Sequence, residues 1–177
     1  ADDSMDWTNG WRGSARNVLI RQTDTADRGI EGDNNGDAMD ASPRSRPVIA
    51  NLTILGSGAG SQAMLLREGS GAEVHNALIA GEFGDGCVDV DDAATVNAGA
   101  IRFRNSVIDC RGGPALMDER RESWQVADAI GWGEGGNRRR EVALEGLRPA
   151  PGSGLLKASA VPPAEQYVGA VGANDWT

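Results

Sequence analysis

The chain is poor in aromatic residues, which make up 5% of its 177 residues, and it contains no long apolar run. A membrane-spanning helix needs about 20 consecutive apolar residues, so the sequence predicts no membrane span. Basic residues are outnumbered by acidic ones, and the net charge is −9. Because binding to nucleic acid depends mainly on cationic contacts to phosphate, this charge argues against a nucleic-acid partner.

Motifs of the common enzyme classes are also missing. His75 is the only histidine, and a lone histidine is more often a surface residue than a general base. The sequence has no nucleophile elbow and no glycine-rich phosphate-binding loop. It also lacks a signal peptide, yet it opens at Ala1 in the middle of a repeat. We therefore expect a mature or proteolysed fragment that forms the C-terminal part of a longer protein, with further repeats upstream.

What the chain does contain is glycine, at 25 residues, and a pattern that is repeated around four asparagines. In each copy a small or apolar residue stands two positions before the asparagine, and an isoleucine stands three positions after it. The asparagines are Asn17, Asn51, Asn76 and Asn105, at spacings of 34, 25 and 29 residues. Repeats of this length are typical of stacked supersecondary units.

An apolar anchor residue accompanies the repeats, at Met5, Ile30, Met64 and Val88, and a fifth copy of the anchor segment spans Gly113–Asp118. Apolar and polar residues alternate on both sides of each asparagine, but the alternation shifts by one residue at the asparagine itself. A one-residue shift moves side chains to the other face, so we expect one strand to end and another to begin there. Asparagine tolerates the left-handed backbone that such a corner needs.

Three short strands in each turn of about 25 residues, stacked in parallel about 4.8 Å apart, predict an all-β fold of the parallel β-helix type. In such a coil the four asparagines lie above one another. Stacked amide side chains can hydrogen-bond along the column. We therefore interpret Asn17, Asn51, Asn76 and Asn105 as a structural asparagine ladder and not as binding residues.

Residues 1–118 hold the repeats, and in residues 119–177 the repeats fade. We expect a short amphipathic helix within 119–130, an exposed loop over 134–140 and an extended tail over 149–172. Because a solenoid needs its open end covered, residues 119–177 are interpreted as an irregular C-terminal lid of the same domain. The tail is also expected to shelter three outward-pointing apolar residues beside the asparagines, which are Leu19, Leu78 and Val107.

The segments that carry these patterns resemble one known superfamily. They are Asp2–Trp11, Gly29–Asp37, Met64–Gly69, Cys87–Ala94 and the closing segment Pro149–Leu156 with Tyr167–Val171. In these motifs the chain resembles the right-handed parallel β-helix superfamily that contains the pectate lyases, and within it bacterial secreted or lipoprotein-type β-helix proteins of unassigned activity. The resemblance implies a right-handed parallel β-helix that is secreted, periplasmic or exposed at the cell surface. It implies no reaction, because one fold hosts many functions.

Cys87 and Cys110 are separated by 23 residues, which is close to one turn of the expected coil. Residues one turn apart lie about 4.8 Å from each other, within the range of Cα separations that a disulfide requires. In a domain that resembles secreted proteins we expect these two cysteines to form a disulfide. Two buried thiols are the alternative, whereas a zinc site would need more ligands than two cysteines supply.

Acidic residues are expected to form two columns on the outside of the coil. If the anchor residues point inward, the residues that follow them point outward, and these are Asp6, Glu31, Leu65 and Asp89. A neighbouring column contains Thr8, Asp33, Arg67 and Asp91. Arg67 is placed to neutralise Asp33 and Asp91. No basic residue is placed to neutralise Asp6 and Glu31, which would stack about 5 Å apart.

Three interpretations of this acidic face stay open. It is a hydrated face neutralised by arginine, a carboxylate pair for glycoside cleavage, or a site for Ca²⁺, which favours oxygen ligands. The candidate catalytic residues are Asp6, Glu31, Arg67, Asp89 and Asp91. The candidate Ca²⁺ ligands are Asp33, Asp37, Asp89 and Asp91.

The leading functional hypothesis is a secreted or cell-surface β-helix module with a structural or ligand-binding role. A polysaccharide or another component of the cell envelope is the expected partner, together with upstream repeats, and Ca²⁺ is the one cofactor considered. The first alternative is a polysaccharide lyase or glycoside hydrolase that acts through the acidic face. The second is an assembly module, because an uncapped N-terminal end leaves strand edges free to pair with another chain.

Overall fold

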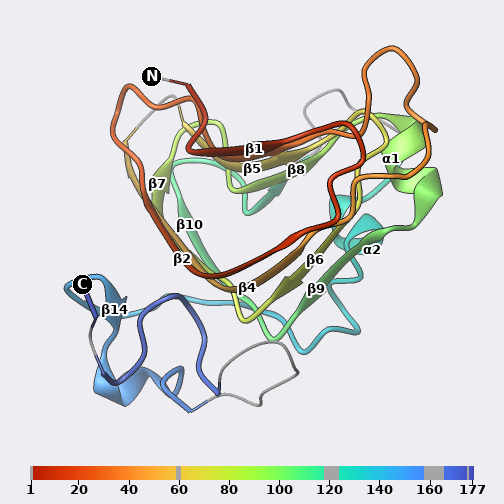
Figure 1. The fold of residues 1–177 in the computed structure, drawn as a ribbon. Coiled ribbons are helices and arrows are strands. Elements are labelled where there is room, and N and C mark those ends of the chain that lie inside the picture. Colours follow the sequence, from red (N-terminus) through yellow and green to blue (C-terminus); the bar gives the residue numbers. More distant parts are fainter. Residues whose placement is uncertain (1, 59–60, 118–123, 158–165, 175) are drawn as a thin grey trace.

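The computed structural model describes residues 2–58, 61–117, 124–157, 166–174 and 176–177. Short parallel strands follow one another around a coil whose turns overlie each other and enclose the core (Figure 1). This is the all-β parallel β-helix that the repeats predict. Among the described residues, no helix has the length and apolar character that crossing a membrane requires.

One wall of the coil, called sheet A, is a parallel sheet built from one short strand of each turn. Its spatial order is β1 (Met5–Trp7), β3 (Arg28–Gly32), β5 (Gln62–Leu66), β8 (Val88–Val90) and β11 (Leu116–Met117). The anchor residues are aligned across this sheet, with Ile30 paired to Met5 and Met64, and Val88 paired to Met64 and Leu116. The register predicted from the repeats is therefore confirmed.

The remaining wall, called sheet B, bends at the asparagines. Its strands are β2 (Ser14–Arg21), β4 (Val48–Gly58), β6 (Ala72–His75), β7 (Leu78–Phe83), β9 (Ile101–Arg104), β10 (Val107–Arg111) and β12 (Arg138–Arg139). β4 spans the whole wall, so that β6 and β7 both pair with it on either side of the corner. The corner is thus a bend within one wall and not a change of sheet.

The corner residues adopt the left-handed backbone that the sequence predicts. Asn17, Asn51, Asn76 and Asn105 have φ angles of 52°, 54°, 53° and 50°. They are in register, because the residues beside them pair across successive strands. Hydrogen bonding between their amides stays a prediction, since the bonds described for Asn51 and Asn76 run to another acceptor, the Tyr167 carbonyl.

The column of corners continues beyond Asn105. The Asn105 amide donates to the carbonyl of Gly135 at 2.7 Å, which places Gly136 at the next corner, with φ of 69°. β12 then pairs in parallel with β10. The exposed loop that we expected over 134–140 is therefore a further, solvent-exposed piece of the coil, in which glycine replaces asparagine.

The core fills the coil with inward-facing side chains of both sheets. Its largest fully buried members include Ile30, Met64, Phe83 and Phe103. At the C-terminal end, Ile130 and Trp132 pack against this core after the short helix α2 (Val126–Ala129). α2 lies within the predicted helical segment 119–130, of which residues 119–123 are outside the described part of the chain. A second helix, α1 (Ala93–Ala98), was not expected from the sequence.

The predicted disulfide between Cys87 and Cys110 is confirmed, with a Cα separation of 6.0 Å. Its geometry differs from the stacking on which the prediction rested. In sheet B the neighbour of Cys110 on the preceding turn is Gly81, whereas Cys87 stands just before β8 in sheet A. The bond therefore joins the two walls across the corner between them.

The described residues that follow β12 form a C-terminal tail, which covers the side of the coil and not its open end (Figure 1). The tail includes the antiparallel hairpin of β13 (Leu144–Glu145) and β14 (Arg148–Pro149), followed by the 3-10 helix η1 (Pro151–Ser153). Val142, Leu155 and Val168 pack on Leu78 and Val107, as predicted, but Leu19 is not part of this cluster. Two asparagines of the column hold the tail in place by donating to the Tyr167 carbonyl.

Candidate functional site

The outer face of sheet A contains the predicted acidic columns. Glu31 lies between Asp6 and Leu65 in the register, and Leu65 is followed by Asp89. Just beyond the strand ends, the Arg67 amide donates to the Gly32 carbonyl. This contact places Arg67 beside Asp33 in the second column.

Glu31 is neutralised by two arginines. Its Oε1 lies 3.0 Å from a terminal nitrogen of Arg67 and 3.1 Å from one of Arg28. The expectation that no basic residue would neutralise Glu31 was therefore wrong. Arg28 stands at the first position of β3, from which its long side chain reaches the outer face.

Arg67 also pairs with Asp33, as predicted, with Nε 3.2 Å from Oδ1. One guanidinium thus bridges carboxylates of both columns. Burial raises the pKa of Glu31 to about 7, against the opposing effects of Arg67 and Arg28. Burial likewise raises the pKa of Asp33, although the neighbouring Arg67 acts in the other direction.

Access to the face differs along the columns. Asp6 is exposed, but Glu31 is 8% exposed, Asp91 is 3% exposed and Asp89 is fully buried. The amide of Gln62 donates to Asp89 at 3.4 Å. The structure therefore places the five candidate catalytic residues on one wall, but three of the four carboxylates are closed to a bulky substrate.

The four candidate Ca²⁺ ligands are spread over this wall and beyond it. Asp33 is held by Arg67, Asp89 lies beside Gln62, and Asp37 is exposed in the insertion that follows β3. Binding of Ca²⁺ by these residues therefore stays one of the three interpretations of the acidic face.

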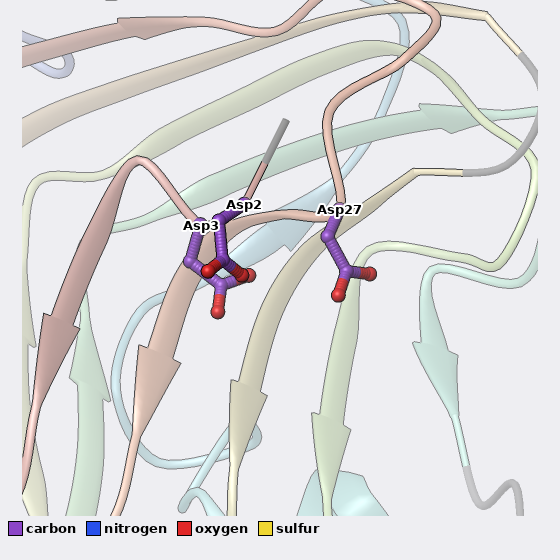
Figure 2. Close-up of side chains that lie close together, drawn as sticks. All are labelled: Asp2, Asp3 and Asp27. Atoms are coloured by element: carbon purple, nitrogen blue, oxygen red, sulfur yellow. The ribbon is translucent and has the colours of Figure 1, made fainter.

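Within the described ranges, one group of three acidic side chains has carboxylate oxygens within 4.8 Å of one another, and it consists of Asp2, Asp3 and Asp27 (Figure 2). Arg28 contacts two members of this group. Its backbone amide donates to Asp3 at 2.9 Å, and its guanidinium lies 2.9 Å from Asp27. Sequence reasoning missed the group, although Asp27 lies about one turn beyond Asp2 and Asp3. We interpret it as an arginine-neutralised cluster.

A groove with a volume of about 390 Å³ lies on the outer face of sheet B. Its floor is formed by the ends of β4 and β7, and its wall by the hairpin of β13 and β14. Arg21 and Arg111 both line it. Sequence reasoning missed these two residues, because nothing local marks two arginines that are 90 positions apart.

Comparison with known proteins gives one match. The family model described as "Pectate-lyase like beta helix domain" matches residues 1–115, which is more than half of the chain. No curated protein and no solved structure matches the sequence.

Proposed function

Because the chain belongs to the family of pectate-lyase-like β-helix domains, we propose that it is a non-catalytic module that binds a polysaccharide outside the cell or at the cell surface. The observation that carries this proposal is the state of the acidic face. Glu31 is engaged by Arg28 and Arg67 at 3.1 and 3.0 Å. Arginines placed in this way neutralise Glu31, so that it does not form a free pair with the exposed Asp6.

Glycoside cleavage needs two carboxyl groups on opposite sides of a bound sugar, about 5 to 9.5 Å apart. Asp6 is exposed, but its neighbour in the column, Glu31, is buried and neutralised. Asp89 is fully buried, so a sugar ring has no path to it. These contacts argue against glycoside cleavage on this wall.

The disulfide supports a location outside the cytosol. Disulfides form and persist in oxidising compartments such as the periplasm or the extracellular space. The bond between Cys87 and Cys110 lies between the two walls of the coil, where Cys87 is fully buried. A buried structural bond of this kind fits a secreted or surface-exposed protein, where it would not be reduced.

Affinity electrophoresis tests the proposal. The purified chain is run in native gels that contain neutral or acidic polysaccharides, with serum albumin as the control for unspecific retardation. We expect at least one polysaccharide to retard the chain at micromolar protein concentration. Migration that is unchanged in every gel would contradict a polysaccharide-binding role.

Assembly is a second candidate function, favoured by the edges at the N-terminal end of the coil. In the described part of the chain, β1 pairs only with β3, and β2 only with β4. The free edge of such a strand presents backbone groups that can accept a strand of another chain. Light scattering over a range of concentrations tests this: a rise in mass supports assembly, and a monodisperse monomer contradicts it.

A further inference from the structure

The groove on sheet B has cations at its two ends and apolar residues between them. Outward-facing positions of sheet B pair in the order Arg21, Leu55, Ala80 and Asp109 on successive strands. Leu55 is the partly exposed apolar position of this row, whereas Ala80 is buried in the cluster that the tail forms on sheet B. The Asp109 carboxylate accepts a hydrogen bond from the Val142 amide at 3.0 Å, so it is engaged by the tail.

Arg21 and Arg111 differ from the arginines of the acidic face. None of the ion pairs in the described part of the chain includes Arg21 or Arg111, although Glu82 pairs in register with Arg111. Arg28 and Arg67, by contrast, each contact at least two acidic side chains. In a chain of net charge −9, two unpaired cations that line one groove indicate an anionic ligand.

The spacing of the two cations restricts the ligand further. Arg21 is on β2 and Arg111 is on β10, three strand intervals apart and offset by two residues along the strand, which corresponds to about 16 Å between their backbones. An acid group bound midway would lie against the apolar side chains of Leu55 and the hairpin, where it would lose water without gaining a counter-charge. A ligand with widely spaced acid groups and an apolar surface between them fits this groove best.

We propose that the groove binds an acidic polysaccharide that carries its acid groups on alternate sugars. In this proposal, which rests on the function proposed above, Arg21 and Arg111 each pair with one acid group. The intervening neutral sugar lies with its C–H face on Leu55, beside the hairpin residues Leu144 and Leu147. Leu144 is among the exposed large apolar side chains of the structure, as expected of a residue that a ligand covers.

Glu82 supplies an independent check on this proposal. It is exposed and pairs in register with Arg111 on the neighbouring strand. Its negative charge therefore opposes the binding of an acid group at Arg111. Replacing it with glutamine should tighten binding, whereas a variant that merely disturbed the fold would weaken it.

The test is a titration of the full chain with a fluorescent hyaluronan octasaccharide, which carries one carboxylate on every second sugar. R21Q and R111Q should each weaken binding by about three- to tenfold, and E82Q should tighten it by about twofold. R16Q is the matched control, because Arg16 is an exposed arginine of β2 that does not line the groove. We expect it to bind as the wild type does.

Two further ligands test the need for acid groups and the spacing between them. Carboxyl-reduced hyaluronan should bind at least tenfold more weakly than the native octasaccharide, and an oligogalacturonate with acid on every sugar should bind less tightly than hyaluronan. If the wild type binds hyaluronan but R21Q and R111Q bind it equally well, the groove is wrong while the polysaccharide-binding function stands. If the wild type binds no polysaccharide, both proposals fail. Equal binding of the carboxyl-reduced chain would overturn the assignment of Arg21 and Arg111.

Discussion

Replacing Asn76 separates the two roles that the structure gives to this corner residue. Asn76 is fully buried, with φ of 53°, and its side chain donates to the Tyr167 carbonyl at 2.8 Å. In N76A the left-handed backbone costs about 1–2 kcal/mol, and the lost hydrogen bond about 1 kcal/mol. We therefore expect the free energy of unfolding to fall by about 2–3 kcal/mol, which lowers the melting temperature by roughly 5–10 °C in a domain of this size.

Glycine at the same position distinguishes backbone strain from the lost hydrogen bond. N76G loses the same side chain, but it accepts the left-handed backbone without strain. We expect N76G to be more stable than N76A by about 0.5–1 kcal/mol, although glycine in a strand is normally the worse residue.

Ala50 and Asn17 provide controls for this comparison. Ala50 is buried in β4 and pairs with His75 in register. At this position glycine should be less stable than alanine, as is normal in a strand, so A50G should lower the free energy of unfolding. Asn17 shares the corner position but is exposed and lies outside the tail contact. In N17A the free energy of unfolding should fall by about 1–2 kcal/mol, because only the backbone strain contributes. Urea denaturation followed by circular dichroism measures all four variants, and the reasoning is refuted if N76G proves less stable than N76A.

Three further predictions concern the disulfide and the acidic face. Replacing Cys87 and Cys110 together with alanine should lower the free energy of unfolding by about 3 kcal/mol, the chain-entropy value for a 23-residue loop; an unchanged urea midpoint would refute this. Because Glu31 has a folded pKa of about 7 against an ordinary 4.5, the wild type should gain stability relative to E31Q as the pH falls from about 8 to about 5. Paired thermal melts measure this, and a constant difference would contradict it. Millimolar Ca²⁺ should leave the melting temperature unchanged, since Arg28 and Arg67 already neutralise the acidic face; a rise that a chelator reverses would instead support a Ca²⁺ site.

The arrangement of turns could be predicted because the same local rules recur in every turn. A period of two fixes which side chains face the core, so Ile30 and Met64 were aligned correctly. Asparagine marks a left-handed corner, so Asn51 and Asn76 were placed in one column. At Gly136 the corner needs no side chain, so the sequence offered no comparable signal for the last piece of the coil.

The state of the acidic face could be predicted only in part. Periodicity shows that Asp89 points outward, but it does not show that other residues cover the carboxylate. The pairing of Arg67 with Asp33 follows from their neighbouring positions. The pairing of Arg28 with Glu31 depends on how a long, flexible side chain leaves the strand end, and no sequence pattern encodes that.

The groove could not be predicted, because it depends on how distant segments pack. Its wall is the hairpin of β13 and β14, which lies on sheet B through contacts of the tail. Those contacts involve Val142, Leu155 and Val168, which no repeat connects to their partners Leu78 and Val107. Tertiary packing of an irregular segment leaves no periodic trace in the sequence.

The central claim is that the chain binds its polysaccharide without cleaving it. The most direct measurement follows the length of a bound acidic polysaccharide by light scattering over a long incubation with excess protein. We expect the bound polymer to keep its length both with the wild-type protein and with D89N. Shortening of the polymer by the wild type but not by D89N would contradict the account and identify Asp89 as part of a catalytic site.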